Sequence, residues 1–86
     1  MQVGAALQTM RLATGLRQGD VARAIGMSQE WLSRVETGDT LPAAEQVASI
    51  VEVLNAHRID RDGAYAEAHT AAREWLAGHA QEAQAR

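Results

Sequence analysis

A short run of hydrogen-bonding side chains, between Ser28 and Thr37, is the part of this sequence best suited to recognise another molecule. On a helix that turns by about 100° per residue, Leu32 and Val35 point inward with Trp31 at their edge. The opposite arc carries the polar residues Gln29, Glu30, Ser33, Arg34 and Thr37. An arginine can donate paired hydrogen bonds, and a glutamine amide both donates and accepts. An ordinary surface helix divides in the same way, so the arc permits recognition of a polar surface without establishing it.

Residues for catalysis or metal binding are missing from the sequence. His57, His69 and His79 are the only imidazoles, and no two of them stand four residues apart. There is no cysteine and no convergent cluster of carboxylates. Because zinc sites need several such ligands at close spacing, no metal or other cofactor is expected. Gly-rich phosphate loops, nucleophile elbows and spaced carboxylate pairs are absent as well, so an enzyme is not expected.

The composition indicates one small all-α domain. The chain has 86 residues, no phenylalanine and a single proline, a mixture that favours helices over strands. No apolar run approaches the roughly 18 residues that cross a bilayer, and no signal segment follows Met1. A soluble, cytoplasmic protein with no membrane partner is therefore expected. The net charge of −3 argues against a nucleic-acid partner, unless acids collect away from the binding face.

Apolar spacing and turn residues divide the chain into five helical segments. The first stops at Gly15, and the second covers about Arg17–Ile25 and stops at Gly26. Ser28 is a good N-cap for a third helix that ends near Thr37.

In the second half of the chain, Pro42 is expected to open a fourth helix, and Asn55–Arg58 is interpreted as a weak break. A fifth helix is predicted over Asp62–His79, followed by a polar end at Gln81–Arg86. The expected fold is a compact five-helix domain with an extended C-terminal helix.

The junction between the second and third helices carries a further signal. Only Gly26 and Met27 join these short helices, which is typical of a helix-turn-helix, although an ordinary helical hairpin has the same outline. Glycines, apolar and polar residues fall in register from Leu7 to Leu54, above all in the run Ser28-Gln29-Glu30-Trp31-Leu32-Ser33-Arg34-Val35-Glu36-Thr37-Gly38. This pattern resembles the Xre/Cro family of helix-turn-helix regulators, whose type members are phage repressors. The resemblance implies a lambda-repressor-like DNA-binding domain at residues 1–58, while 59–86 lie outside it.

Two positions depart from the family pattern. Arg17 stands where the family has Thr, Ser or Asn as the N-cap of the second helix. Gly19 lies inside that helix and costs about 1 kcal/mol relative to alanine. Asp20, in the first turn, is expected to offset part of the loss.

The resemblance implies that the polar arc of the third helix enters the major groove of double-stranded operator DNA. There Arg34 would donate to O6 and N7 of guanine, and Gln29 would pair with N6 and N7 of adenine. Ser33 lies in the same arc as a further base contact. Glu30 could accept from a cytosine amino group, but we favour the interpretation that it stabilises the first turn of its own helix.

Contacts with the DNA backbone are implied as well. Gln18 would lie against one strand, and the Gly38 amide against the other side of the groove. Trp31 could donate to a phosphate, although packing over the edge of the core is the favoured interpretation. The complete set of expected backbone contacts is Gln18, Arg17, Ser28, Trp31, Thr37, Gly38 and Thr40.

Arg11 and Glu36 are expected to form a structural ion pair. Glu36 falls near the apolar border of the third helix, where an unpaired carboxylate is costly. Family members often pair an arginine of the first helix with this glutamate, and Arg11 stands in that position. Bracing of the third helix is favoured over contact of Arg11 with phosphate.

The fifth helix supplies the candidate dimer contact. One helix-turn-helix reads few base pairs, so useful affinity requires two copies on a pseudo-palindromic site with half-sites about 34 Å apart. The alternative is that this helix folds back onto its own core. The apolar stripe assigned to the dimer interface is Tyr65, Ala68, Ala72, Trp75 and Leu76.

The predicted function is transcriptional repression by a homodimer bound to operator DNA. A second hypothesis is the antitoxin of a toxin–antitoxin pair, whose tail helix would bind a toxin. A third is a protein-interaction module that has lost DNA binding, which the acidic charge favours. The chain is too short for a separate ligand-binding domain, so control by protein concentration or by a partner such as a toxin or co-repressor is expected.

Overall fold

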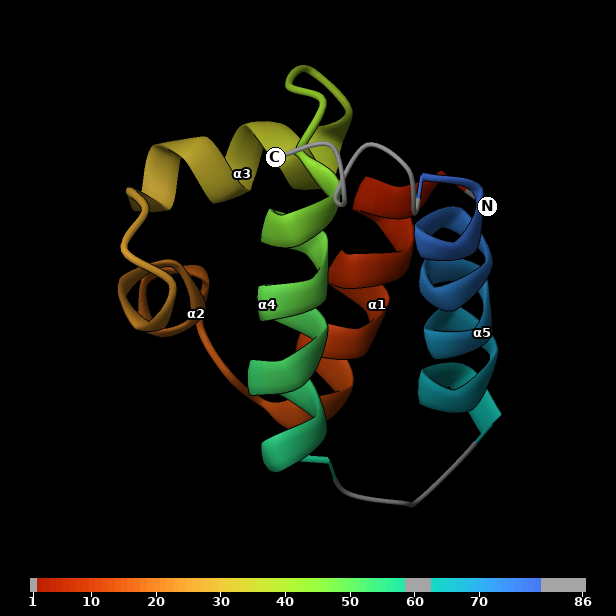
Figure 1. Cartoon of the computed structure of the whole chain (residues 1–86). Coiled ribbons are helices and arrows are strands. Elements are labelled where there is room, and N and C mark those ends of the chain that lie inside the picture. Colours follow the sequence, from red (N-terminus) through yellow and green to blue (C-terminus); the bar gives the residue numbers. More distant parts are fainter. Residues whose placement is uncertain (1, 59–62, 80–86) are drawn as a thin grey trace.

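The computed structural model describes residues 2–58 and 63–79, which form five α-helices and no strand (Figure 1). The helices are α1 (Val3–Thr14), α2 (Gln18–Ala24), α3 (Gln29–Thr37), α4 (Ala44–Ala56) and α5 (Gly63–Gly78). The all-α, five-helix prediction is confirmed. Within the described ranges, none of the helices combines the length and the apolarity that a membrane span requires.

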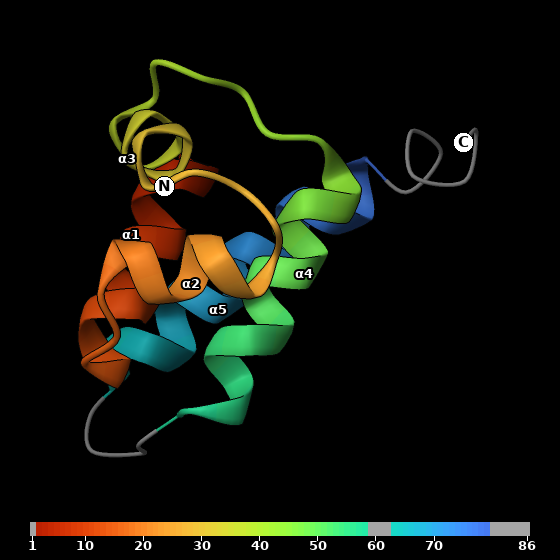
Figure 2. The same ribbon diagram turned by 90° about the vertical axis from the view of Figure 1, so that its left-hand side faces the viewer.

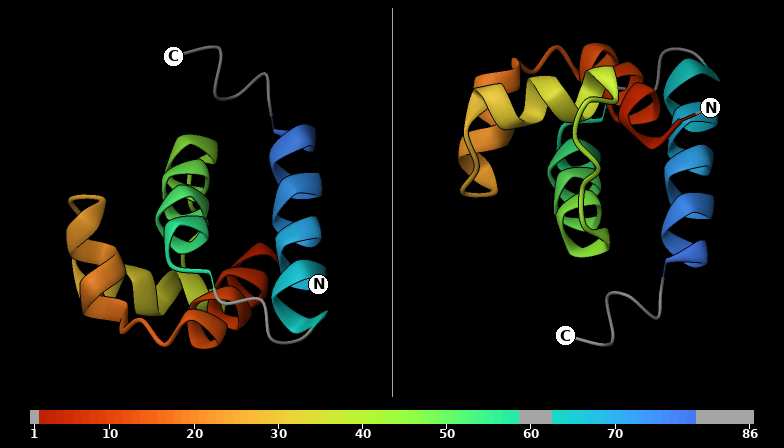
Figure 3. Two further views of the ribbon diagram at one scale, coloured as in Figure 1. Left: turned by 90° about the horizontal axis from the view of Figure 1, so that it is seen from below. Right: turned by 90° about the horizontal axis from the view of Figure 1, so that it is seen from above.

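One apolar core joins the five helices, and α1 contacts α3, α4 and α5. In Figure 1, α4 stands in front of α1, α3 crosses the top, and α2 and α5 lie on either side. The views from below and above show α2 and α5 on opposite sides of the α1–α4 pair (Figure 3), and the view from the α2 side places α5 behind it (Figure 2). The core side chains exposed by 1% or less are Ala6, Leu7, Met10, Val21, Ala22, Leu32, Val35, Val47, Ile50, Leu54, Tyr65, Ala68 and Ala72.

Local hydrogen bonds set the ends of α2 and α3. The missing cap at Arg17 is replaced in part by Asp20, whose Oδ2 accepts from the Arg17 amide at 3.2 Å, so α2 begins one residue later than expected. Gly26 has a φ of +74°, which allows the chain to turn sharply between the two helices. Oγ of Ser28 then accepts from the Trp31 amide at 3.1 Å, which confirms the predicted N-cap of α3.

The expected bounds of α4 are wrong at both ends. Pro42 is buried ahead of the helix, and α4 begins at Ala44 because Oε1 of Gln46 accepts from the Ala43 amide at 2.8 Å. At the other end, the predicted break at Asn55–Arg58 starts only at His57. Asn55 stays helical, and its side-chain oxygen accepts a hydrogen bond from the hydroxyl of Tyr65 on α5.

The predicted dimer contact on α5 is wrong for three of its five residues. Tyr65, Ala68 and Ala72 are each exposed by 1% or less and belong to the chain's own core, so they are not available to a second copy. The two alanines carry too little side chain to keep α5 away from α1. Trp75 and Leu76 remain only partly buried. The predicted helix start at Asp62 and the polar end at Gln81–Arg86 lie outside the described residues.

Close contact between α1 and α3 depends on Gly4. A Cβ atom added at Gly4 would stand 1.9 Å from the backbone oxygen of Val35. The lack of a side chain therefore lets the first turn of α1 lie directly against the backbone of α3. This approach fixes the position of α3 relative to the rest of the core.

Candidate nucleic-acid interface

The outer face of α3 is polar and accessible. Leu32 and Val35 are buried beneath it, as the helical spacing predicted. The side chains of Gln29, Glu30 and Arg34 are exposed, and none of them makes a side-chain hydrogen bond or ion pair within the described part of the chain. Their hydrogen-bonding groups are therefore free to meet a ligand.

Gln18 brings α2 to the same polar face. It lines one shallow hollow together with four residues of α3, namely Gln29, Glu30, Ser33 and Arg34. The structure thus gathers the four predicted base-reading residues and one predicted backbone contact in a single place. A hollow lined by two amides, a carboxylate, a hydroxyl and a guanidinium offers both donors and acceptors.

Arg11 and Glu36 form the predicted ion pair. Nε of Arg11 donates to Oε2 of Glu36 at 2.7 Å, and Nη2 donates to Oε1 at 2.9 Å. The Glu36 side chain is only 1% exposed. The remaining Nη1 group donates to the backbone oxygen of Leu16 at 2.9 Å, so this arginine also holds the segment that leads into α2. A paired geometry of this kind fixes orientation as well as distance.

Gln18 has a second partner that the sequence did not indicate. Its Nε2 donates to Oε1 of Glu36 at 3.0 Å. The residue is half-buried, and one of its two amide N–H groups is used inside the protein. No spacing rule connects residues that lie 18 positions apart on two helices, so only the fold reveals this bond.

At the C-terminal end of α3, one expected contact is wrong. The Gly38 amide donates to Val35 O at 3.2 Å, and the Thr40 amide donates to Arg34 O at 3.1 Å. Both amides therefore close the helix rather than face a phosphate. The hydroxyl of Thr37 also points back, to Arg34 O at 3.2 Å, although this residue stays exposed.

Trp31 is partly buried and packs against the core, in agreement with the favoured interpretation. Ser28 is exposed, but its hydroxyl is occupied as the N-cap of α3.

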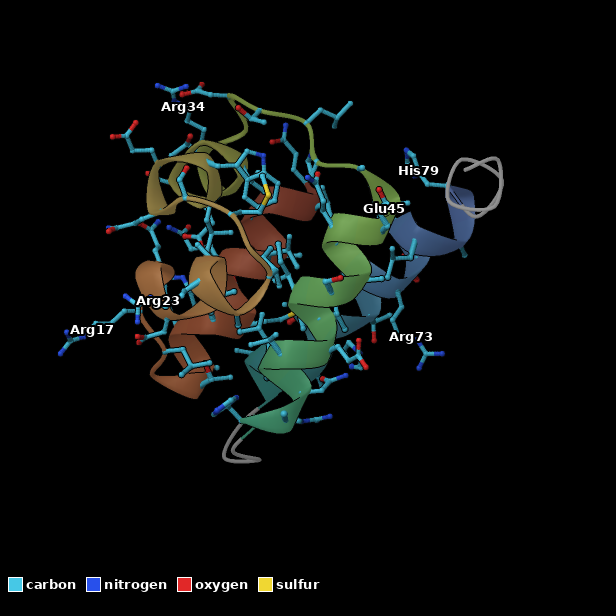
Figure 4. The ribbon with its side chains drawn as sticks, turned by 60° about the vertical axis from the view of Figure 1, so that its left-hand side comes forward. Arg17, Arg23, Arg34, Glu45, Arg73 and His79 are labelled. Atoms are coloured by element: carbon cyan, nitrogen blue, oxygen red, sulfur yellow. The ribbon has the colours of Figure 1, made fainter. Side chains whose placement is uncertain are left out.

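The basic side chains are unevenly distributed over the molecule. Figure 4 shows Arg17, Arg23 and Arg34 extending from the α2–α3 side, whereas Arg73 extends from the opposite side. Arg17 and Arg23 mark the two ends of α2, and Arg34 lies on α3. The same segment also carries Asp20, Glu30, Glu36 and Asp39, so this side of the molecule is not basic overall.

The two short helices joined by a glycine turn, with a polar outer face on the second, define a helix-turn-helix protein. Residues 2–63 match the family described as "Helix-turn-helix domain", and the chain belongs to this family. Over 54 residues it is 33% identical to the ImmF control region 10 kDa protein of Bacillus phage phi105. The match covers 63% of this chain and spans 60% of that phage protein. No solved structure matches this chain.

Proposed function

We propose that this chain is a sequence-specific transcriptional repressor of the Xre/Cro type, which inserts α3 into the major groove of operator DNA. The observation that carries the proposal is the shared polar hollow of Gln18, Gln29, Glu30, Ser33 and Arg34. These accessible groups sit on a helix that is held from behind by the Arg11–Glu36 pair. Similarity to a phage control-region protein supports a regulatory role. The role needs no catalytic group and is carried out where the operator lies, in the cytoplasm.

Base recognition is assigned to Arg34 and Gln29. Arg34 donates to O6 and N7 of guanine, and Gln29 pairs with N6 and N7 of adenine, each pair contributing about 1–3 kcal/mol of discrimination. Ser33 adds a contact from the same hollow. Glu30 is exposed in the first turn of α3, where it stabilises the helix and discourages approach of a phosphate.

Backbone contacts are assigned mainly to the α2 side of the helix-turn-helix. Arg17 is exposed ahead of α2, and the second amide N–H of Gln18 is available to a phosphate oxygen. Ser28 and Trp31 lie at the start of α3, Thr37 is its last residue, and Thr40 follows its end. With so few cations, each such contact matters, and two copies on a pseudo-palindromic operator are needed for useful affinity.

Selection of bound sequences from random double-stranded DNA tests the proposal. We expect a pseudo-palindrome with half-sites one helical turn apart, about 34 Å. Arg34→Ala should relax the preference at one base pair of each half-site. Arg23→Ala, a matched loss of charge on the same side of the molecule, should weaken all sequences equally. Failure to enrich any sequence would overturn the proposed function.

A further inference from the structure

Gly19 is a glycine for which the packing of the core gives no reason. The other described glycines have left-handed φ values, lie in a close helix contact or stand at the ends of α5; in that order they are Gly15, Gly26 and Gly38, then Gly4, then Gly63 and Gly78. Gly19 has neither a positive φ nor a backbone neighbour in close contact, and it lies within α2. A glycine in a helix is less favourable than an alanine. The missing side chain at position 19 therefore points to a role outside folding.

The space beside Gly19 borders the polar hollow. Apart from its chain neighbours and its own helix backbone, a Cβ atom built at Gly19 would have one described neighbour within 4 Å, namely Oε1 of Gln29 at 3.8 Å. This is an ordinary van der Waals distance, so a methyl group fits. A longer side chain would extend from that Cβ into the surroundings of the Gln29 amide, which lines the hollow together with Gln18. The size of residue 19 therefore decides how much room the Gln29 side chain has.

We propose that Gly19 is a positioning residue for base recognition, because its lack of a side chain leaves room for the Gln29 amide to align with a base edge. The inference rests on the proposed function, in which Gln29 pairs with N6 and N7 of adenine. That pairing uses the amide oxygen and nitrogen together, so it requires one orientation of the amide plane. Bulk beside the amide removes this orientation and, with it, the preference for adenine.

The two amides of the hollow are held in different ways. Nε2 of Gln18 donates to Oε1 of Glu36 at 3.0 Å, which fixes this side chain from inside the protein. Gln29 is exposed and makes no side-chain hydrogen bond within the described part of the chain. Its orientation therefore depends on the space left by its neighbours, of which Gly19 is one. A change at position 19 acts on the base contact of Gln29 and leaves the backbone contact of Gln18 in place.

Binding titrations on the full chain test this role, with the selected site and a second site in which the base pair identified by Gln29→Ala is exchanged. Gly19→Leu should weaken binding to the selected site by at least about fivefold, the lower end of the discrimination from one paired base contact, and leave binding to the exchanged site unchanged. Gly19→Ala should keep the affinity for both sites, because its methyl group fits. Ala24→Leu, which adds bulk to an exposed position of α2 outside the hollow, is the matched control and should keep both affinities.

Thermal melts followed by circular dichroism separate loss of affinity from loss of folding. Gly19→Leu and Gly19→Ala should both melt at or above the wild-type temperature, because both replace a glycine in a helix. Gly19→Met, another good helix former of similar bulk to leucine, repeats the binding test. A loss of affinity without a loss of stability then reports on the site and not on the fold.

The double variant with Gly19→Leu and Gln29→Ala shows whether leucine acts through Gln29. Added to Gln29→Ala, Gly19→Leu should cause no further loss of affinity, because the amide is already gone. An equal loss in both backgrounds would overturn the inference, since leucine would then obstruct DNA directly. Unchanged affinity of Gly19→Leu for the selected site would overturn it as well, and would leave the proposed function standing. If the wild-type chain selects no sequence, the proposed function fails and this inference with it.

Discussion

Nε2 of Gln18 donates a hydrogen bond of 3.0 Å to Oε1 of Glu36, so the first residue of α2 is joined to the buried acid of α3. The same oxygen accepts from Nη2 of Arg11 at 2.9 Å. Three helices therefore meet at one carboxylate. The polar hollow that we propose to face DNA and the internal bracing of α3 share Gln18, so the proposed contact with DNA depends on the position of α3.

Gln18→Ala should reduce affinity for all DNA sequences alike, because the lost contacts are with the backbone and with Glu36, not with a base edge. The free energy of unfolding should fall by about 1 kcal/mol, the usual value of one hydrogen bond. Binding titrations on the selected site and on a scrambled site measure the first effect. Gln29→Ala is the matched control and should lower affinity for the selected site alone. A selective loss with Gln18→Ala would contradict its assigned role.

Arg11→Met should lower the free energy of unfolding by about 3–5 kcal/mol, because it leaves the Glu36 carboxylate buried without its cation. Glu36→Leu should be similarly damaging, since it strands the Arg11 guanidinium. The double variant should be markedly less destabilised than the sum of the two single variants. Urea unfolding of the four proteins completes the cycle. Strict additivity would show that the pair does not brace α3.

Gly4→Ala should destabilise the fold by about 1–3 kcal/mol, because the new methyl group collides with the backbone oxygen of Val35 and α1 must move away from α3. Gly19→Ala provides the opposite case. A Cβ there meets only Oε1 of Gln29, at 3.8 Å, so the helix propensity of alanine should stabilise α2 by up to about 1 kcal/mol. Thermal melts of both variants check the two signs. Equal shifts in the melting temperature would refute the close packing.

Acidification should destabilise the protein through His69. Burial, together with the nearby charges of Arg73 and Arg58, lowers the pKa of His69 below its ordinary value of 6.5. Just below pH 6.5, the unfolded chain then binds more protons than the folded one. The contribution of neutral His69 to the free energy of unfolding is therefore fully present above pH 6.5. It is lost as the pH falls from 6.5 toward the lowered pKa of the folded protein. Melting curves over this range should show a smaller acid loss for His69→Gln than for the wild type. Parallel pH profiles would exclude the effect.

Short-range patterns predicted most of the helical framework. Ser28 caps α3 as expected, and Leu32 and Val35 are buried by the helical spacing alone. Periodicity identified the apolar face of α5 but not its partner, because Tyr65 and Ala72 would show the same spacing against a second copy or against α1. The close contact at Gly4 is likewise a property of two helices far apart in the sequence.

In the candidate site too, features set by a single helix were predicted, whereas features set by the packing of two segments were not. The outward direction of Gln29 and Arg34 follows from the geometry of one helix, so the sequence predicted it. The hydrogen bond from the Gly38 amide to Val35 O could not be predicted in this way, because it depends on how the chain turns after α3. The bond from Gln18 to Glu36 also requires α2 and α3 to be packed together.

The exposed side chains of α3 have an evolutionary consequence. Gln29 and Arg34 make no side-chain hydrogen bonds in the described part of the protein, whereas Glu36, on the reverse of the same helix, is held by two partners. Substitutions at the two outward positions should therefore carry little penalty in folding, and under the proposed function they would change the preferred operator. Under that proposal, a lineage of such proteins would acquire new DNA sites by substitutions at a few positions while the folded scaffold stays the same.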